Sequence, residues 1–222
     1  MTMKQNTTFK TISDPECLRI YPAVAANAQE FYRSGEILCG EGLYGKAISM
    51  LILGAEEYVK ALCLMLDGYG CNTRKIQGME KIFFTHDPRH RLSRDFLTVW
   101  TVLSEFLSIS ASKSFASNVK QAISGIVNLI TADDQREWWL SADKFKQNGF
   151  YVDYRDEPWT PATLNRTDYE KAWSYTREIP VVFKKLSHYL SGLTPGEVKQ
   201  FVADFKMADF ESLIKEALQR KN

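Results

Sequence analysis

Apolar residues recur at intervals of three and four along most of the chain, whereas the strict alternation typical of a half-buried strand is scarce. This pattern predicts an all-α fold. Asp14 and Pro15 have the chemistry of a helix start, and the helix that follows is expected to run to about Gly40. Pro22 lies inside this range and predicts a kink or a break. A second helix is expected over residues 43–69.

The middle of the chain predicts two more helices and one loop. Asp87 and Pro88 begin the third helix, and a fourth is expected over about residues 118–147, ended by Gly149. Residues 148–166 combine two prolines with four aromatic residues. This composition favours an ordered loop packed on the helical bundle over a flexible linker.

The C-terminal part predicts additional helices. One is expected over residues 167–190, and a last amphipathic segment begins at Thr194, which can form a capping box with Glu197. The length of 222 residues suits one sizeable core. We therefore expect a single helical domain over residues 1–222.

Composition adds little about partners. Basic residues number 28 and acidic residues 27, so the net charge identifies no binding partner. The N-terminus lacks the apolar core of a signal peptide, and the longest uncharged apolar stretch, residues 47–55, is too short to span a bilayer. The expectation is a cytoplasmic protein without a membrane partner.

The four cysteines form no C-x-x-C pair, and most lie in helical patterns where a thiol behaves as a small apolar group. No glutamate is followed three positions later by histidine, as a di-iron bundle requires. We therefore expect no metal site and no cofactor. Catalysis by a cysteine and histidine pair is also disfavoured, because the expected neighbours of the cysteines are apolar.

The second expected helix is apolar nearly all round, but its polar residues share one sector roughly 100° wide. These residues, called the polar stripe below, are Lys46, Ser49, Glu56, Glu57, Lys60 and Asp67. Lys60 follows Glu56 by four positions and Glu57 by three, so its ammonium can reach either carboxylate. The stripe is either a surface strip with helix ion pairs or a set of buried charges that need partners.

A basic cluster, THDPRHRLSR, occupies residues 85–94. Arg89, His90 and Arg91 fall in the first turn of an expected helix, where the helix dipole disfavours cations. A bound phosphate would relieve this conflict, and His86 or His90 could transfer a proton near neutral pH. The alternative is a solvated helix start whose basic residues pair with nearby acids.

Three blocks, GLYGKAISMLILGAEEYVKAL, FFTHDPRHRL and GFYVDYRDEPWTP, occur in this order over roughly residues 42–175. Together they make the chain resemble the AbiV family of bacterial abortive-infection proteins, which belongs to the HEPN helical superfamily. The family pattern falls on these residues: Glu56, Glu57 and Lys60, then His86 with Arg89, then Tyr151, Val152 and Asp153. The resemblance implies a HEPN-like helical bundle, a role in phage defence and a homodimer.

The sequence departs from the ribonuclease signature found in many HEPN proteins, an arginine followed after four to six intervening residues by a histidine. None of His86, His90 and His188 has an arginine at that spacing. Lys81 lies five positions before His86, but lysine lacks the planar fork of arginine. Whether the protein is an enzyme therefore stays open at this point.

Two functions are compatible with these observations. In the first, an abortive-infection effector acts on RNA or translation, with His86 as general acid or base, Arg89, His90 and Arg91 binding phosphate, and Glu56, Glu57 and Lys60 completing the site. Tyr151 and Asp153 support this site or anchor their loop. In the second, a non-catalytic effector binds a phage or host protein and arrests translation or growth. The first hypothesis predicts contact between one of the two glutamates and His86 or Arg89.

Overall fold

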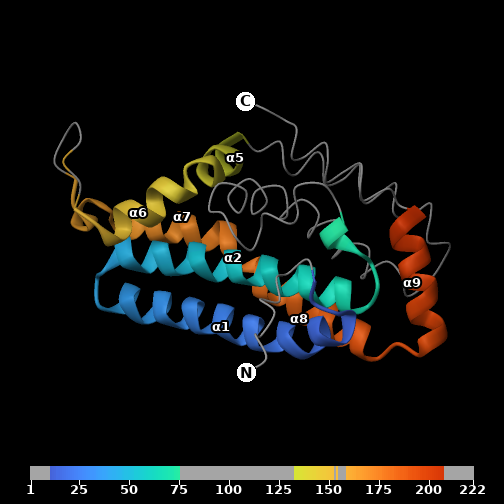
Figure 1. Cartoon of the computed structure of the whole chain (residues 1–222). Coiled ribbons are helices and arrows are strands. Elements are labelled where there is room, and N and C mark those ends of the chain that lie inside the picture. Colours follow the sequence, from blue (N-terminus) through green and yellow to red (C-terminus); the bar gives the residue numbers. More distant parts are fainter. Residues whose placement is uncertain (1–10, 76–132, 153, 155–158, 208–222) are drawn as a thin grey trace, which may run out of the picture.

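The computed structural model describes residues 11–75, 133–152, 154 and 159–207. Within these ranges every regular element is a helix, which confirms the predicted all-α fold (Figure 1). The third expected helix, beginning at Asp87, lies outside the described residues. The elements are α1 Asp14–Gly40, α2 Tyr44–Gly68, η1 Thr73–Lys75, α5 Asp133–Leu140, α6 Ala142–Phe150, η3 Pro161–Thr163, α7 Arg166–Thr176, α8 Glu178–Ser191 and α9 Pro195–Met207.

Helices α1 and α2 form an antiparallel hairpin (Figure 1). The N-cap of α1 is Ser13, one residue before the predicted start, and it forms a capping box with Glu16. Pro22 lies inside α1, so the alternative of a break at this proline is wrong. The turn into α2 uses Gly42 with φ +73°, a left-handed conformation that glycine adopts without strain.

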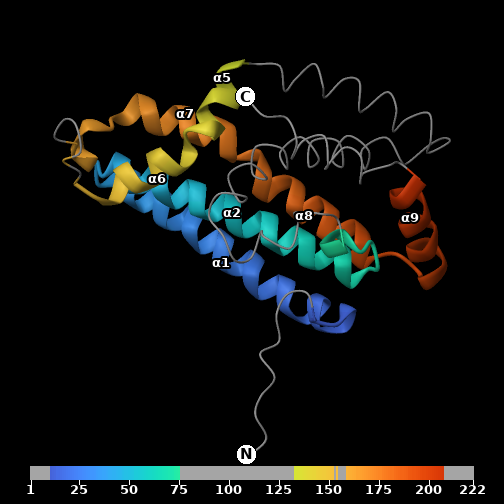
Figure 2. The same ribbon diagram turned by 45° about the horizontal axis from the view of Figure 1, so that its top comes forward.

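Helix α2 is the central helix of the bundle. It packs against α1, α6, α7 and α8, and most of its residues between Gly45 and Asp67 are buried. In both orientations α1 and α8 run alongside it, and α9 lies at the end of the bundle opposite to the α1–α2 turn (Figures 1 and 2). On most sides of α2, a polar side chain therefore faces a neighbouring helix and is buried.

The helix predicted over residues 167–190 is divided into α7 and α8 at Arg177. Pro180 explains the break, because proline has no N–H to donate to the carbonyl of Thr176 and its ring clashes with that carbonyl in a continuous helix. The hydroxyl of the buried Tyr32 donates a hydrogen bond of 2.8 Å to this carbonyl instead. This hydrogen bond connects the junction of α7 and α8 to α1.

The prediction of one helix over residues 118–147 is also wrong in its described part. A turn at Ser141 separates α5 from α6, and α6 continues to Phe150 instead of stopping at Gly149. Gly149 faces α2, where an added Cβ atom would overlap the carbonyl oxygen of Gly45 and the hydroxyl of Ser49. This glycine therefore serves close helix packing, not helix termination.

The sequence predicts that residues 148–166 form an ordered loop packed on the bundle. Among its described residues, those of the second half pack in this way. The indole nitrogen of Trp159 donates a hydrogen bond of 2.9 Å to the carbonyl of Asn148, and Leu164 is buried. Tyr151 and Val152, however, are exposed. The capping box predicted at the start of α9 is confirmed, since the backbone N–H of Thr194 donates to the Glu197 carboxylate at 2.8 Å.

Candidate functional site

The polar stripe of α2 is not a surface strip, because Ser49, Glu56 and Asp67 are buried. Glu57 and Lys60 keep partial exposure, and Lys46 is exposed. Each buried member contacts polar groups from outside α2. The hypothesis of buried charges that need partners therefore describes these members of the stripe.

Glu56 forms a buried ion pair with Lys146 of α6. The Lys146 ammonium lies 2.8 Å from Oε1 of Glu56, and the two residues are 6% and 2% exposed, respectively. A second carboxylate, that of Asp143, lies 3.3 Å from the same ammonium. Removing charges from water costs several kcal/mol per ion, and only close pairing with good hydrogen bonds offsets this cost.

The backbone of Lys146 is fixed to α2 as well. The hydroxyl of Ser49 donates hydrogen bonds to the carbonyl of Lys146 at 2.8 Å and to the carbonyl of Gly45 at 3.1 Å. Contact between α2 and α6 is close at this level, since a Cβ atom on Gly45 would lie 3.3 Å from the Cα atom of Gly149. Ser49, Gly45 and Gly149 therefore fix the position of Lys146 relative to α2.

The sequence-based prediction missed Lys146. One signal was available: Ala142, Lys146 and Gly149 are spaced by four and three residues, so they share one face of a helix on which two small residues flank the lysine. Small residues on one face indicate close packing against another helix. This pattern did not identify Glu56 as the partner, because the two residues are 90 positions apart.

Glu57 and Lys60 form the second ion pair of the site, within α2. Their side chains are 18% and 15% exposed, so both remain partly accessible to solvent or to a ligand. The two adjacent glutamates therefore lie in different environments. Glu56 faces α6 in the core, whereas Glu57 and Lys60 lie nearer to the surface.

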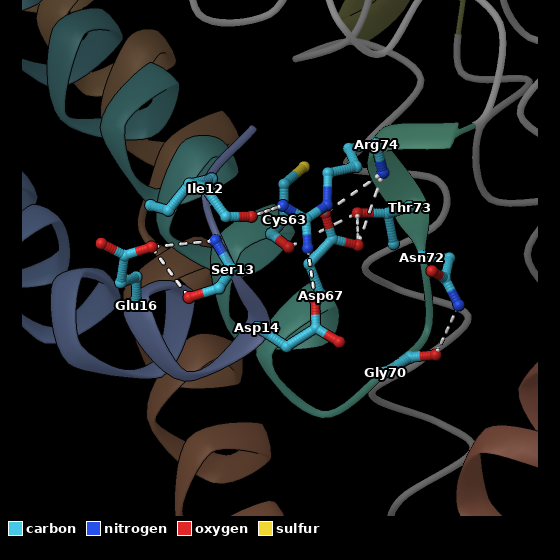
Figure 3. A network of polar contacts seen from close by, with 10 residues as sticks. All are labelled: Ile12, Ser13, Asp14, Glu16, Cys63, Asp67, Gly70, Asn72, Thr73 and Arg74. Atoms are coloured by element: carbon cyan, nitrogen blue, oxygen red, sulfur yellow. Dashed lines mark hydrogen bonds and ion pairs between the residues drawn. The ribbon is translucent and has the colours of Figure 1, made fainter. Parts of the chain in front are cut away.

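The far end of the stripe belongs to a separate polar network (Figure 3). Asp67 accepts hydrogen bonds from the hydroxyl of Thr73 at 2.8 Å and pairs with Nε of Arg74 at 3.2 Å. Arg74 also donates to the carboxylate of Asp14 and to the carbonyl of Ile12. This network joins the start of α1 to the end of α2, which is a structural role.

Burial raises the pKa of the Asp67 carboxyl, and the hydrogen bond from Thr73 and the charge of Arg74 offset part of this effect. Burial also raises the pKa of the Cys63 thiol. A buried thiol with a raised pKa is a poor nucleophile. In the described ranges no three histidine, cysteine or acidic side chains gather as a metal site would require.

The remaining predicted site residues divide into two groups. Tyr151 is 68% exposed, so its ring lies on the surface of the molecule rather than inside the bundle. His86, Arg89, His90, Arg91 and Asp153 lie outside the described residues. The predicted contact of a glutamate with His86 or Arg89 therefore stays a prediction.

Comparison with known proteins identifies a matching family model. A family model described as AbiV matches residues 16–179, which include both ion pairs of α2 and α6. No curated protein and no solved structure matches the chain. Among the helices that the structure describes, none is long and apolar enough to cross a membrane.

Proposed function

Because the chain belongs to the AbiV family of HEPN proteins, which indicates abortive infection in defence against phage, we propose that it is an effector acting on RNA or on translation. The proposed site contains the Glu57–Lys60 pair of α2 and the buried Glu56, which precedes Glu57 in the sequence. His86 serves as general acid or base, and Arg89, His90 and Arg91 bind phosphate. Tyr151 and Asp153 have supporting roles.

The observation that carries this proposal is the difference between the two glutamates. Glu56 is held in the core by Lys146, whereas Glu57 and Lys60 form a pair that a ligand can still reach. RNA-directed chemistry requires a group that moves a proton and a cation that binds a phosphate oxygen. A partly exposed carboxylate and ammonium supply both kinds of group.

Phage plaque assays test the proposal, using a phage against which the wild-type chain protects. Glu57→Gln and His86→Ala are each expected to raise the plating of that phage towards the level of cells without the protein. Removing a general acid or base typically lowers a rate by about 10² to 10⁴-fold. Total RNA from the infected cells should be degraded with the wild type and intact with either variant.

A matched control is Glu170→Gln, which removes the carboxylate of the exposed Arg166–Glu170 pair of α7. It involves the same chemical change as Glu57→Gln, on a side chain of α7 that is 61% exposed and has no part in the proposed chemistry, and it should keep full defence. Folding of all variants is compared by circular dichroism. Undegraded RNA in cells that the wild type still protects would rule out RNA cleavage, and full defence by folded Glu57→Gln and His86→Ala would rule out this site.

One observation favours a second candidate, an effector that binds a phage or host protein without catalysis. Tyr151, Val152 and Tyr154 are exposed on the segment after α6. Exposed aromatic and aliphatic side chains close together are typical of protein interaction sites.

Substitutions on this segment distinguish the two candidates. Under the second candidate, Tyr151→Ala combined with Val152→Ser should abolish defence, whereas His86→Ala should retain it. The site on α2 predicts the opposite result for His86→Ala. Plaque assays on both variants, together with a check of their folding, decide between the candidates.

A further inference from the structure

Lys146 is attached to α2 at two levels. Its carbonyl accepts a hydrogen bond from Ser49, and its ammonium pairs with Glu56. Ser49 and Glu56 are two helical turns apart, about 10 Å along the axis at 1.5 Å per residue. Both ends of this lysine are therefore constrained, which leaves its ammonium little freedom of position.

Stability alone does not account for a buried pair of this kind. Replacing a buried ion pair with apolar side chains of similar size is often neutral or stabilising. Apolar residues occur on the same helix faces, since Ile52 of α2 and Ala142 of α6, each one turn before a member of the pair, are fully buried. The charges thus have no evident advantage over methionine or leucine for holding α2 against α6.

The position of the pair relates it to the proposed site. Glu56 is adjacent in sequence to Glu57, whose carboxylate pairs with Lys60 one turn further along α2. Fixing the carboxylate of Glu56 therefore fixes a negative charge on the same turn of α2 as this accessible pair. Asp143, on the same ammonium, adds a half-exposed carboxylate from α6.

We propose that Lys146 is a positioning residue of the site: its ammonium holds the carboxylate of Glu56 in a fixed orientation on the turn of α2 that carries the Glu57–Lys60 pair. This inference rests on the proposed function of that pair. It extends the site from α2 onto α6, which the sequence did not indicate. Lys146 itself is buried and acts through Glu56, not by contact with a substrate.

The test replaces the pair as a unit, with Glu56→Met and Lys146→Met in one variant. A purely structural pair predicts that this variant folds and protects cells as the wild type does. Positioning predicts a folded protein, with a thermal midpoint at or above that of the wild type, that has lost defence in the plaque assay. The matched control is Arg166→Met with Glu170→Met, which removes an exposed pair and should keep full defence.

A folded Glu56→Met, Lys146→Met variant with full defence would overturn the role of Lys146. If that variant does not fold, Glu56→Gln with Lys146→Gln is used, because two amides can keep a hydrogen bond without charge. This second variant is likewise expected to fold and to lose defence. Failure of both variants to fold would show that the charges are required by the fold, which also overturns the proposal.

Glu57→Gln and His86→Ala in the same assay separate this inference from the function on which it rests. Loss of defence in these two variants, with full defence in the folded methionine variant, removes the roles of Lys146 and Glu56 and leaves the Glu57–Lys60 pair as the site. Full defence in Glu57→Gln and His86→Ala removes the proposed function and with it the role given to Lys146.

Discussion

At the scale of single residues, three buried polar side chains in the described part of the chain have partners outside their own helix. Glu56 pairs with Lys146, Asp67 with Arg74, and the hydroxyl of Tyr32 with the carbonyl of Thr176. An unpaired polar group in the same surroundings would destabilise the fold. These partners therefore matter more for the stability of the bundle than the exposed ion pairs do.

Asp67 gives the stability of the protein a predictable dependence on pH. Because its pKa is raised in the folded state, the stability it contributes is fully present below the unfolded value of about 3.9 and decreases as pH rises through the folded value. Asp67→Asn removes this decrease. The stability of the wild type minus that of the variant should therefore fall over this pH range, as measured by urea unfolding at several pH values. A difference that stays constant or grows would contradict the raised pKa.

Tyr32 offers a second test at this scale. Tyr32→Phe leaves the carbonyl of Thr176 without the hydroxyl donor, and an unsatisfied buried acceptor costs about 1–3 kcal/mol. Tyr58→Phe is a matched control, because this tyrosine is equally buried and its hydroxyl makes no hydrogen bond within the described part of the chain. Urea unfolding should show a clear loss for Tyr32→Phe and a smaller one for Tyr58→Phe. Equal losses would argue against the hydrogen bond.

At the scale of elements, the crossing of α2 and α6 is the contact that forms the candidate site. Gly45 and Gly149 allow the two helices to approach closely, and Ser49 joins their backbones at the same level. Lys146 lies one turn before Gly149, so the position of its ammonium depends on this crossing.

Gly149→Ala tests the crossing. The added Cβ atom would overlap the carbonyl oxygen of Gly45 and the hydroxyl of Ser49, so the helices must separate. Overpacking of this kind costs about 1–3 kcal/mol, which exceeds the gain in helix propensity of about 1 kcal/mol. Thermal unfolding should show a lower midpoint, and the shift of α6 should weaken defence. Gly196→Ala in α9 is the control, since its Cβ atom would meet nothing within 4 Å.

At the scale of the whole molecule, α2 lies among α1, α6, α7 and α8, and the two ends of the bundle differ. The network of Asp67 and Arg74 lies at the end of α2, whereas the Gly45 and Gly149 crossing lies at its start, near the exposed segment after α6 (Figures 1 and 3). The candidate site of Glu56 and Glu57 lies between these ends, in the middle of α2.

The oligomeric state is a prediction at this scale. The resemblance to HEPN proteins implies a homodimer, and the chain mass is 25.5 kDa. Sedimentation velocity is expected to show a species of twice this mass. A single species at the mass of one chain, over a range of protein concentrations, would contradict the dimer.

Much of the fold could be predicted because the signals are local. The 3.6-residue period predicted α1 and α2, and Thr194 with Glu197 predicted the start of α9. The break between α7 and α8 was also readable from Pro180, since a missing N–H is a local property. Gly149 was misinterpreted as a helix end, because the same residue type serves helix termination and close helix packing.

The candidate site likewise has features that the sequence predicts and features that depend on tertiary packing. The sequence by itself determined the helical class, the family blocks and the placement of the polar stripe on one sector of α2, because periodicity depends on neighbours along the chain. Only the tertiary structure decided that Glu56 is buried on Lys146 while Glu57 stays accessible with Lys60. That outcome depends on how α6 packs across α2 from 90 residues away, and packing of distant segments leaves no local periodic signal.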